Sequence, residues 1–453
     1  MNLFFELIRR IILERIIPAG RVFNINASLA DALAKRSVHW TREEIESYQG
    51  NRLKALVKHC FQNVPYYRRV MDERNLTPND FKRPQDVSKF PILTKQIIRD
   101  NGPELRARNY PDSICQFRRS GGTTGEPTKV AICPTARSIE IAMYLRGFSW
   151  MGWRPGKPII QLFGGSLGIG GTSARARLVN WLLNTIFLSA FELRRENVKE
   201  YSQTVLKNPG GVLVGYSSAV FNLAELISAE NLPTGNLVSI ICTAEQMPDA
   251  WKARIQEAFK VPCFMYYGCG EIQSVAYESM SAEKYIVCQE RVILEVADPK
   301  EDVFRDSGNG AFCITDLHNY AMPMIRYQNG DAGTIGYLSG SPSHQRIIEL
   351  DGRIMDRLIT IDGQLICSAL PPHMILRSGL RVSKFQLIQF DRRNLLFRYA
   401  TESGNELDFS EKEIVRGVFR KYLGEGMNVD FAFEGFEISK SGKHRFVINH
   451  LLM

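Results

Sequence analysis

Short apolar runs alternate with segments of helical spacing through the middle of the chain. Four runs have the length and the bounding turn residues of buried strands: Ile159–Phe163, Val212–Val214, Leu237–Cys242 and Cys263–Tyr267. Helical patterns that end near Glu230 and Lys260 separate the last three. This alternation predicts an α/β domain with a largely parallel sheet. Ligands of such sheets collect at the carboxyl ends of the strands, so we expect Tyr216, Thr243 and Glu245 to lie there.

The pattern predicts further elements on both sides of this region. Thr41, followed by Glu43 and Glu44, is typical of a helix N-cap with acids in the first turn. Helical spacing also runs from Arg137 to about Gly152. Residues 3–17, LFFELIRRIILERII, predict an amphipathic helix that ends before the proline at 18 and either docks on the protein or lies at a membrane interface.

Composition narrows the class of protein. The 453 residues suggest two or three domains, and 44% hydrophobic with 23% charged residues argues against disorder. A net charge of +9 favours an anionic partner: a nucleotide, coenzyme A, an acidic carrier protein or a membrane surface. Neither zinc-finger spacing nor a basic run with interleaved aromatics indicates nucleic acid. Nine cysteines without a CxxC pair indicate reduced thiols in the cytoplasm, and the lack of an apolar run of 18 residues argues against a membrane span.

A glycine-rich loop, RRSGGTTGEPTK at residues 118–129, lies between the predicted strands Ile114–Phe117 and Val130–Ile132. Glycines let backbone N–H groups converge and hydroxyls add donors, so the loop is suited to polyphosphate oxygens. Glu126 follows Gly125 where a Walker A loop has lysine. The alternative is a flexible hairpin loop. A second glycine-rich stretch, residues 164–172, either bounds a substrate cleft or is a connector.

Three downstream turns also carry candidate chemistry. In Tyr267–Glu271 an aromatic ring can stack on a base, glycines permit close approach and a carboxylate can hold Mg²⁺. The run Pro323–Asp331 predicts a strand and a turn whose carboxylate can accept ribose hydroxyls. For both, the alternative is an ordinary strand-end turn. Asp351–Leu358 predicts a turn between two strands, and Ser439–Arg445 a basic hairpin loop after the strand Phe431–Ile438.

Together these motifs resemble the adenylate-forming superfamily, most closely its phenylacetate–coenzyme A ligase-like branch. The match covers roughly residues 50–450 in the family's order, and several motifs in sequence are more specific than one. The length and N-terminal leader are similar to the sub-branch encoded with capsule and exopolysaccharide genes. The motifs that carry the resemblance are Asp86–Lys95, Ser120–Thr128, Tyr267–Glu271, Arg326–Asp331, Gly352–Asp356 and Ser441–Lys443.

The resemblance implies an N-terminal helix at residues 1–25, a large multi-sheet α/β domain at 26–355 and a small mobile α+β lobe at 357–453, with Asp356 as the hinge. It implies that a small carboxylic acid attacks the α-phosphate of ATP with Mg²⁺ present, and that a thiol, coenzyme A first of all, then displaces AMP. The implied nucleotide-binding residues are Ser120, Gly121, Gly122, Thr123, Thr124, Gly125, Thr243, Ala244, Glu245, Tyr267, Gly268, Asp331 and Arg353. Glu271 would bind Mg²⁺, Lys443 would stabilise the reacting oxygens, and Phe163, Gly164, Tyr216 and Ser217 would line the acid pocket.

The chain also departs from the family pattern. Gly122 is an additional glycine, and Gln246 stands where proline is common. Some relatives bind a structural zinc after the Tyr-Gly-x-x-Glu motif, but Cys288 alone cannot form a four-ligand site, so we expect no zinc. The segment Asp362–Cys367 replaces a glycine-rich continuation, which leaves the acceptor open between coenzyme A, a carrier protein, and an amine or hydroxyl. A non-catalytic nucleotide-binding scaffold is the remaining alternative; the retained Lys443 argues against it.

Overall fold

The computed structural model describes residues 8, 27–119, 129–163, 174–190, 192–297, 303–339, 341–353, 358–363, 365–366, 380, 382–401, 403–437 and 445–451. The predicted helix at residues 3–17 therefore lies outside the described residues, apart from position 8. Within the described ranges no helix is long and apolar enough to cross a membrane. The eight cysteines in these ranges are free thiols.

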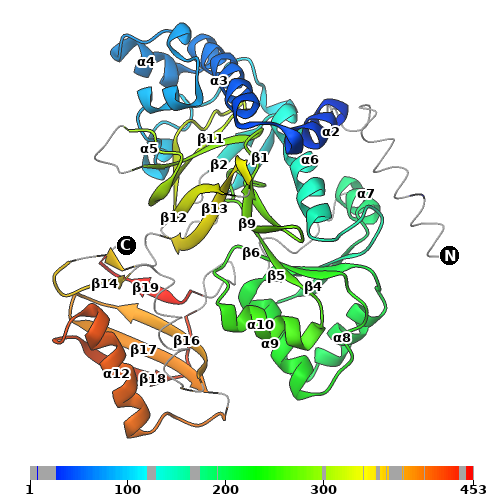
Figure 1. The fold of residues 1–453 in the computed structure, drawn as a ribbon, viewed down its shortest axis with the longest axis vertical. Coiled ribbons are helices and arrows are strands. Elements are labelled where there is room, and N and C mark those ends of the chain that lie inside the picture. The colour runs from blue at the N-terminus through cyan, green and yellow to red at the C-terminus, as the bar shows by residue number, and fades with distance from the viewer. Residues whose placement is uncertain are drawn as a thin grey trace.

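Five parallel strands form one half of an eleven-stranded sheet. In spatial order they are β4 (Thr185–Ser189), β3 (Ile159–Phe163), β5 (Val212–Tyr216), β6 (Ser239–Thr243) and β7 (Cys263–Tyr267). Alternate side chains enter two separate cores because successive residues of a strand point to opposite faces. One core includes α8 (Val198–Leu206), α9 (Ser217–Ala229) and α10 (Asp249–Phe259), and the other includes α6 (Pro134–Trp150). The prediction of a layered α/β domain is confirmed (Figure 1).

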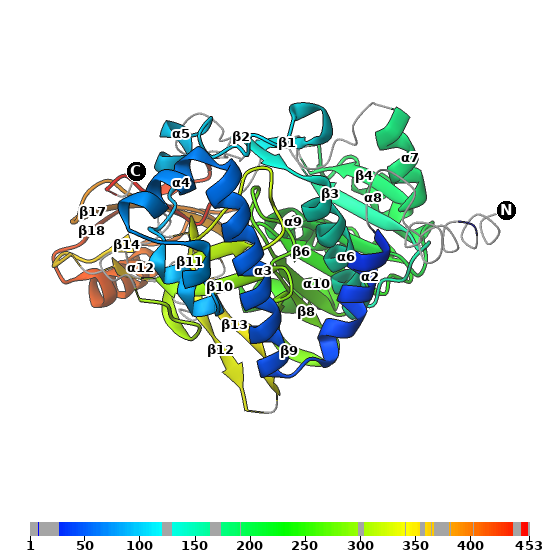
Figure 2. The ribbon, with the colours of Figure 1, turned by 90° about the horizontal axis from the view of Figure 1, so that it is seen from above.

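The sheet changes to antiparallel pairing after β7. The strands on this side are β8 (Ala276–Ser279), β9 (Ala282–Val287), β13 (Ser341–Arg353), β12 (Tyr327–Leu338), β11 (Gly308–Asp316) and β10 (Val292–Ala297). Helices α3 (Arg42–Asn63), α4 (Pro65–Glu73) and α5 (Lys95–Asp100) share a core with them, and α3 crosses this half of the sheet (Figure 2). Thr41 forms the predicted N-cap of α3, and its side chain accepts from the Glu44 amide. The parallel arrangement predicted for the sheet therefore holds only up to Tyr267.

The remaining helices, and the strands that flank the glycine-rich loop, complete the N-terminal part. Helix α2 (Ala27–Arg36) lies against α6, and α7 (Ala174–Leu182) precedes β4. Strands β1 (Gln116–Arg119) and β2 (Lys129–Ile132) pair antiparallel, as predicted for strands that flank a loop. The first of them starts later than predicted, because a short 3-10 helix occupies Asp112–Ile114.

A four-stranded sheet with its own core forms the C-terminal part, drawn in orange and red in Figure 1. Its spatial order is β18 (Asn428–Phe433), β17 (Asn394–Thr401), β16 (Val382–Gln389) and β19 (Val447–Asn449). Helix α12 (Phe409–Leu423) packs on it through Val415 and Phe419, and a short pair, β14 (Leu358–Ile359) and β15 (Leu365–Ile366), lies nearby. Strand β18 ends at Phe433 rather than at the predicted Ile438, because Glu434 adopts a φ of +60°.

The predicted turn at the end of Pro323–Asp331 is instead part of a continuous strand, and the first three residues of the predicted turn Asp351–Leu358 also belong to a strand, while residues 354–357 lie outside the described residues. Strand β12 begins at Tyr327 and passes through Gly330, and β13 continues through Gly352 to Arg353. Both glycines have a positive φ, +92° and +84°, which an L-residue rarely adopts. The β12–β13 pairing contains register shifts, one of them between Ala332 and Gly333, so irregular pairing accommodates these backbones inside the sheet.

Candidate active site

Predicted site residues meet where the parallel strands end. Tyr216 ends β5 and pairs in register with Thr243, which ends β6. Phe163 ends β3, and its ring meets Tyr216 edge-on, with centroids 5.0 Å apart. The Thr243 hydroxyl donates to the Tyr266 carbonyl at 3.0 Å, which links β6 to β7. The strand ends therefore place the predicted acid-pocket side chains directly beside the predicted adenine-binding turn.

The turn after β6 is held to helix α9. Ala244 has a φ of +68°, a conformation that costs an L-residue roughly 1–2 kcal/mol. The turn brings the carboxylate of Glu245 to the first turn of α9, where it accepts from the Ser218 amide at 2.8 Å. An anion at a helix N-terminus is favourable because the backbone N–H groups there point outwards. Ser217, at the start of α9, is fully buried in the same junction.

A hydrogen-bonded triad joins the end of β7 to β12. The hydroxyl of Tyr267 donates to Oδ2 of Asp331 at 2.8 Å, and Nδ2 of Asn329 donates to the Tyr267 hydroxyl at 2.7 Å. The same Asn329 amide also reaches Oδ2 of Asp331 at 2.7 Å. Burial, and then the Asp331 charge, raise the pKa of Tyr267 well above its ordinary value, so the phenol remains a donor. Two predicted nucleotide-binding residues are thus in direct contact.

The charges of Glu271 and Asp331 act on the same two neighbouring side chains, Tyr327 and Cys269. Burial comes first in raising the pKa of Tyr327, and the charges of Glu271 and Asp331 both add to it. Burial followed by the same two carboxylates also raises the pKa of Cys269. The charges of both predicted carboxylates therefore act on Tyr327 and on Cys269, so Glu271 and Asp331 lie around one site.

The Glu271 side chain fits a hard cation. It is 4% exposed, and the Tyr327 phenol is its neighbour, but its Oε1 atom makes no hydrogen bond of normal geometry among the described residues. A buried carboxylate oxygen without a partner is unfavourable, and Mg²⁺ prefers oxygen ligands. The described residues contain no group of three or more His, Cys, Asp or Glu side chains placed to bind one ion. Mg²⁺ would therefore take its other ligands from phosphate oxygens and water, as it commonly does.

Gly268 is required by the tight turn between Tyr267 and Glu271. A Cβ atom at this position would lie 3.0 Å from the Ser274 amide nitrogen and 3.1 Å from the Gln273 Cα. These are backbone atoms, so a side chain would push the turn apart. The segment that follows Glu271 therefore packs closely against this glycine, and the predicted close approach of a nucleotide there stays a prediction.

Sequence analysis missed the role of Arg326, which the motif contains. This side chain is fully buried, its φ is +52°, and its Nε lies 2.9 Å from Oε1 of Glu295. The Arg326 guanidinium also donates to the Phe90 carbonyl at 2.9 Å, and the Leu93 amide donates to the Arg326 carbonyl at 3.0 Å. Arg326 thus fixes the Phe90–Leu93 segment, part of the Asp86–Lys95 motif, against β12, four residues ahead of Gly330. An arginine in an apolar run was the one signal in the sequence.

A second ion-pair network borders the glycine-rich loop. Nη1 of Arg118, near the end of β1, lies 2.8 Å from Oε2 of Glu140 on α6. Nη2 of Arg291 lies 3.1 Å from the same oxygen and 3.4 Å from Asp316. Burial raises the pKa of Glu140, but Arg291 and Arg118 outweigh burial and the pKa is lowered. The strand that enters the loop and the helix that follows it are thereby joined through Glu140.

Several predicted site residues lie outside the described residues, so their placement stays a prediction. This applies to the whole phosphate-loop candidate, the glycine after Phe163, the hinge and the closing lysine, and to the side chain of one arginine. They are Ser120, Gly121, Gly122, Thr123, Thr124, Gly125, Gly164, Asp356, Lys443 and the Arg353 side chain.

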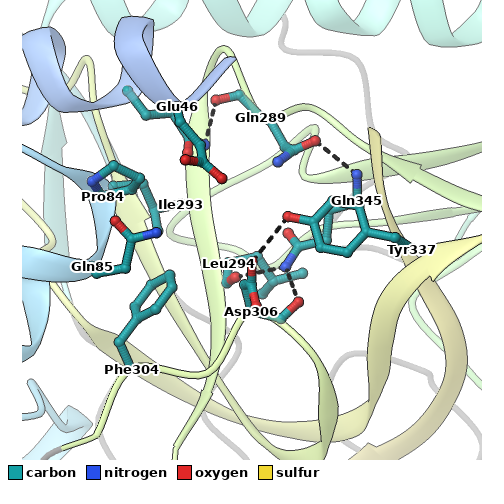
Figure 3. A pocket seen from close by; sticks show the side chains of 11 residues that line it. Glu46, Pro84, Gln85, Gln289, Ile293, Leu294, Phe304, Asp306, Tyr337 and Gln345 are labelled. Carbon is teal, nitrogen blue, oxygen red and sulfur yellow. Dashed lines mark hydrogen bonds between the residues drawn. The ribbon is translucent and has the colours of Figure 1, made fainter. Parts of the chain in front are cut away.

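A small polar cavity of about 10 Å³ lies between α3 and the antiparallel strands, and Figure 3 shows its lining. The backbone N–H of Gln345 donates to Oε1 of Gln289 at 2.8 Å, and the Tyr337 hydroxyl donates to Oδ2 of Asp306 at 3.2 Å. The volume suits about one water molecule. The cavity has the size of a hydration site within the protein and is too small for a nucleotide.

Comparisons with known proteins show what the chain is similar to. No family model matches the chain. Phenylacetate–coenzyme A ligase of Aromatoleum evansii is 26% identical over 70% of this chain and 72% of its own length. Protein CapK of Staphylococcus aureus is 22% identical over 89% of both chains. The crystal structure of 2-hydroxyisobutyryl-CoA ligase in its postadenylation state superposes with a TM-score of 0.72 at 20% identity, covering 90% of this chain and 89% of that one.

The fold, with a large α/β sheet followed by a small C-terminal sheet, is that of 2-hydroxyisobutyryl-CoA ligase. The curated relatives narrow the assignment further. The chain is similar to phenylacetate–coenzyme A ligases over 70% of its length, and the order of its motifs resembles the same branch.

Proposed function

We propose that this protein is an ATP-dependent, AMP-forming carboxylate–coenzyme A ligase. The observation that carries the proposal is the meeting of Tyr267, Asp331 and Glu271 at one site beside the parallel strand ends. The phenylacetate–coenzyme A ligases it matches are named for the thioester they form. An aromatic ring, a carboxylate for ribose and a carboxylate for a cation are the groups that a magnesium nucleotide requires.

The first half-reaction forms an acyl-adenylate. One carboxylate oxygen of the acid bonds to the α-phosphorus while the bond from that phosphorus to the bridging oxygen of pyrophosphate breaks. The nucleophile is already an anion, so positioning and positive charge matter more than a general base. In the proposed assignment Tyr267 stacks on adenine, Asp331 accepts the ribose hydroxyls with Arg353 nearby, and residues 120–125 hold the β- and γ-phosphates.

Mg²⁺, held by Glu271, would supply charge that neutralises the phosphate oxygens. Lys443 would add positive charge at the carboxylate and α-phosphate oxygens from the C-terminal lobe. We assign that lobe to residues 357–453, hinged at Asp356, and the large domain to residues 26–355. In the second half-reaction the thiolate sulfur bonds to the acyl carbon, and the bond to the AMP oxygen breaks.

The acid is proposed to lie against Phe163, Tyr216 and Ser217, beside Gly164. Phe163 and Tyr216 are buried aromatic side chains in edge-on contact, so the walls on this side are apolar. Such walls favour an aryl or medium-length acyl group over an acid that carries a second charge.

Transfer of the acyl group to a carrier protein, or to an amine or hydroxyl in polysaccharide assembly, is the second candidate. It is favoured by the segment Asp362–Cys367, which stands where the family has a glycine-rich continuation. The two candidates share the first half-reaction and differ only in the acceptor.

Pyrophosphate release with a panel of aryl and medium-chain acids tests the shared step. We expect at least one acid to release pyrophosphate and to give an acyl-adenylate detectable by mass spectrometry. Lys443→Ala should lower this rate by roughly 10²–10³-fold, by analogy with removal of one preorganised donor. Product formation that depends on free coenzyme A supports the first candidate, whereas adenylate formation without thioester supports the second. If no acid releases pyrophosphate, the proposal is wrong.

A further inference from the structure

Three of the four side chains in the turn Thr243–Gln246, which ends β6, are anchored to other elements. Thr243 donates to a carbonyl of β7 at 3.0 Å, and Glu245 accepts from an amide of α9 at 2.8 Å. Gln246 adds a third anchor, because its Nε2 donates to the carbonyl of Asp351 on β13 at 2.7 Å. The turn is therefore held by three different elements of the large domain.

The remaining residue of this turn, Ala244, is exposed and has a φ of +68°. An L-residue in this left-handed conformation is strained, and such strain persists only where the surroundings fix the backbone. Strained residues of this kind are concentrated at functional sites, and Ala244 is one of the implied nucleotide-binding residues. Its anchored neighbours keep the Ala244 backbone in this conformation.

The Gln246 anchor reaches the strand that pairs with the ribose side of the proposed site. Asp351 is 3% exposed, and its carboxylate accepts from Nδ2 of Asn309 at 3.2 Å, so this part of β13 is fixed within the sheet. Two residues further along β13, Arg353 pairs in register with Asp331. One side-chain hydrogen bond thus joins the turn that carries Ala244 to the strand beside the proposed ribose carboxylate.

Position 246 is also a departure from the pattern that the chain resembles, in which proline is common. Proline fixes its own φ and restricts the residue before it, so it stiffens a turn through the backbone. Glutamine has no such restraint. In this chain the hydrogen bond from the Gln246 side chain supplies a restraint that does not come from the backbone.

We propose that Gln246 is a positioning residue for the nucleotide: its amide fixes the strained turn at Ala244 to β13, and so holds the base side of the site against Asp331. This inference rests on the proposed function and deepens its nucleotide site. Such an anchor contributes to the binding of the nucleotide in the ground state and in the transition state alike. Its loss should therefore weaken binding and leave the chemical step nearly unchanged.

The test measures equilibrium binding of ATP and of AMP, with Mg²⁺ present, by isothermal titration calorimetry. Gln246→Ala removes the side chain, and Gln246→Met keeps its volume but removes the donor. We expect both to raise the Kd for ATP roughly three- to tenfold, the scale of one neutral hydrogen bond. The Kd for AMP should rise by the same factor, because the turn is assigned to the base and not to the β- and γ-phosphates. At saturating ATP, kcat for pyrophosphate release should stay within about twofold.

Two further variants separate positioning from a general loss of structure. Gln203→Ala, at an exposed glutamine of α8, is the matched control and should bind ATP as the wild type does. Ala244→Gly in the Gln246→Ala background should recover part of the ATP affinity, because glycine adopts a positive φ without strain. A merely structural defect would instead lower the melting temperature and kcat together, and this glycine would not restore binding.

The outcomes separate this inference from the ligase assignment. A wild-type Kd for ATP in Gln246→Ala or in Gln246→Met overturns the inference and leaves the ligase assignment intact. A loss of ATP binding without a matching loss of AMP binding also overturns it, since the effect then lies at the phosphates. If the wild type binds ATP but adenylates none of the acids, the ligase assignment fails, and the Kd values of the variants still decide the role of Gln246.

Discussion

Removing one hydroxyl, in Tyr267→Phe, tests whether the triad of Tyr267, Asn329 and Asp331 positions the nucleotide. The substitution keeps the aromatic ring and removes the donor that lies 2.8 Å from Oδ2 of Asp331. Hydrogen bonds to charged groups contribute roughly 1.5–3 kcal/mol. Asp331 is half-buried and keeps its contact with Asn329, so we expect about 1.5 kcal/mol, the lower end of that range.

That free energy corresponds to roughly a tenfold rise in the KM for ATP, since about 1.4 kcal/mol is a factor of ten. The assay is pyrophosphate release at varied ATP with a saturating acid. Tyr337→Phe is the matched control: Tyr337 lies on β12, the strand that also carries Asp331, and donates to Asp306 in the same way at 3.2 Å, at the cavity in Figure 3. The control should leave the KM for ATP unchanged.

A double-mutant cycle with Asp331→Asn makes the prediction stricter. Residues in direct contact couple by roughly 0.5–3 kcal/mol, whereas independent sites add to within about 0.5 kcal/mol. We expect a coupling of about 1–2 kcal/mol in the KM for ATP. An active Tyr267→Phe enzyme with wild-type KM, or effects that simply add, would refute the assigned contact between this phenol and the ribose-binding carboxylate.

Three further predictions follow from buried charges. Glu140→Gln should lower the free energy of unfolding by roughly 3–5 kcal/mol, because two arginines lose their buried partner. The control is Glu230→Gln, at the exposed Arg195 pair, which should cost less than about 1 kcal/mol. Thermal unfolding of the two variants measures both losses. Burial, and then Arg52, lower the pKa of His318 to about 3. Between about pH 6.5 and 3 the unfolded chain therefore binds a proton at this imidazole and the folded chain does not. The free energy of unfolding should fall as the pH falls through this range. His318→Gln should remove about 2 kcal/mol of the loss at pH 5, measured by urea unfolding against pH, and an unchanged slope would contradict this. Glu271→Gln should raise the Mg²⁺ concentration needed for pyrophosphate release roughly tenfold or more, and an unaltered Mg²⁺ dependence would exclude that carboxylate as a ligand.

Local patterns in the chain predicted the elements that build the site. The strands that end at Phe163, Tyr216, Thr243 and Tyr267 were recognisable because a buried parallel strand is a short apolar run between turn residues. The same reasoning failed at Gly330, because glycine usually indicates a turn. The positive φ of Gly330 is accommodated inside strand β12 by irregular pairing with β13. A local stretch of sequence does not show which strand it will pair with, so this could not be predicted.

What the sequence by itself determined was four of the five parallel strands, the set of residues at their ends and the resemblance to a family, because these depend on periodicity and on motifs within a few positions. The edge strand β4 was not predicted. What only the tertiary structure decided was which of these residues touch. Tyr267 bonds to Asp331 across sixty-four positions, Arg326 pairs with Glu295, and Trp251 meets the C-terminal lobe. Such contacts depend on the register of the sheet and on the pairing of buried charges. The register and the charge partners are fixed only when distant segments pack together.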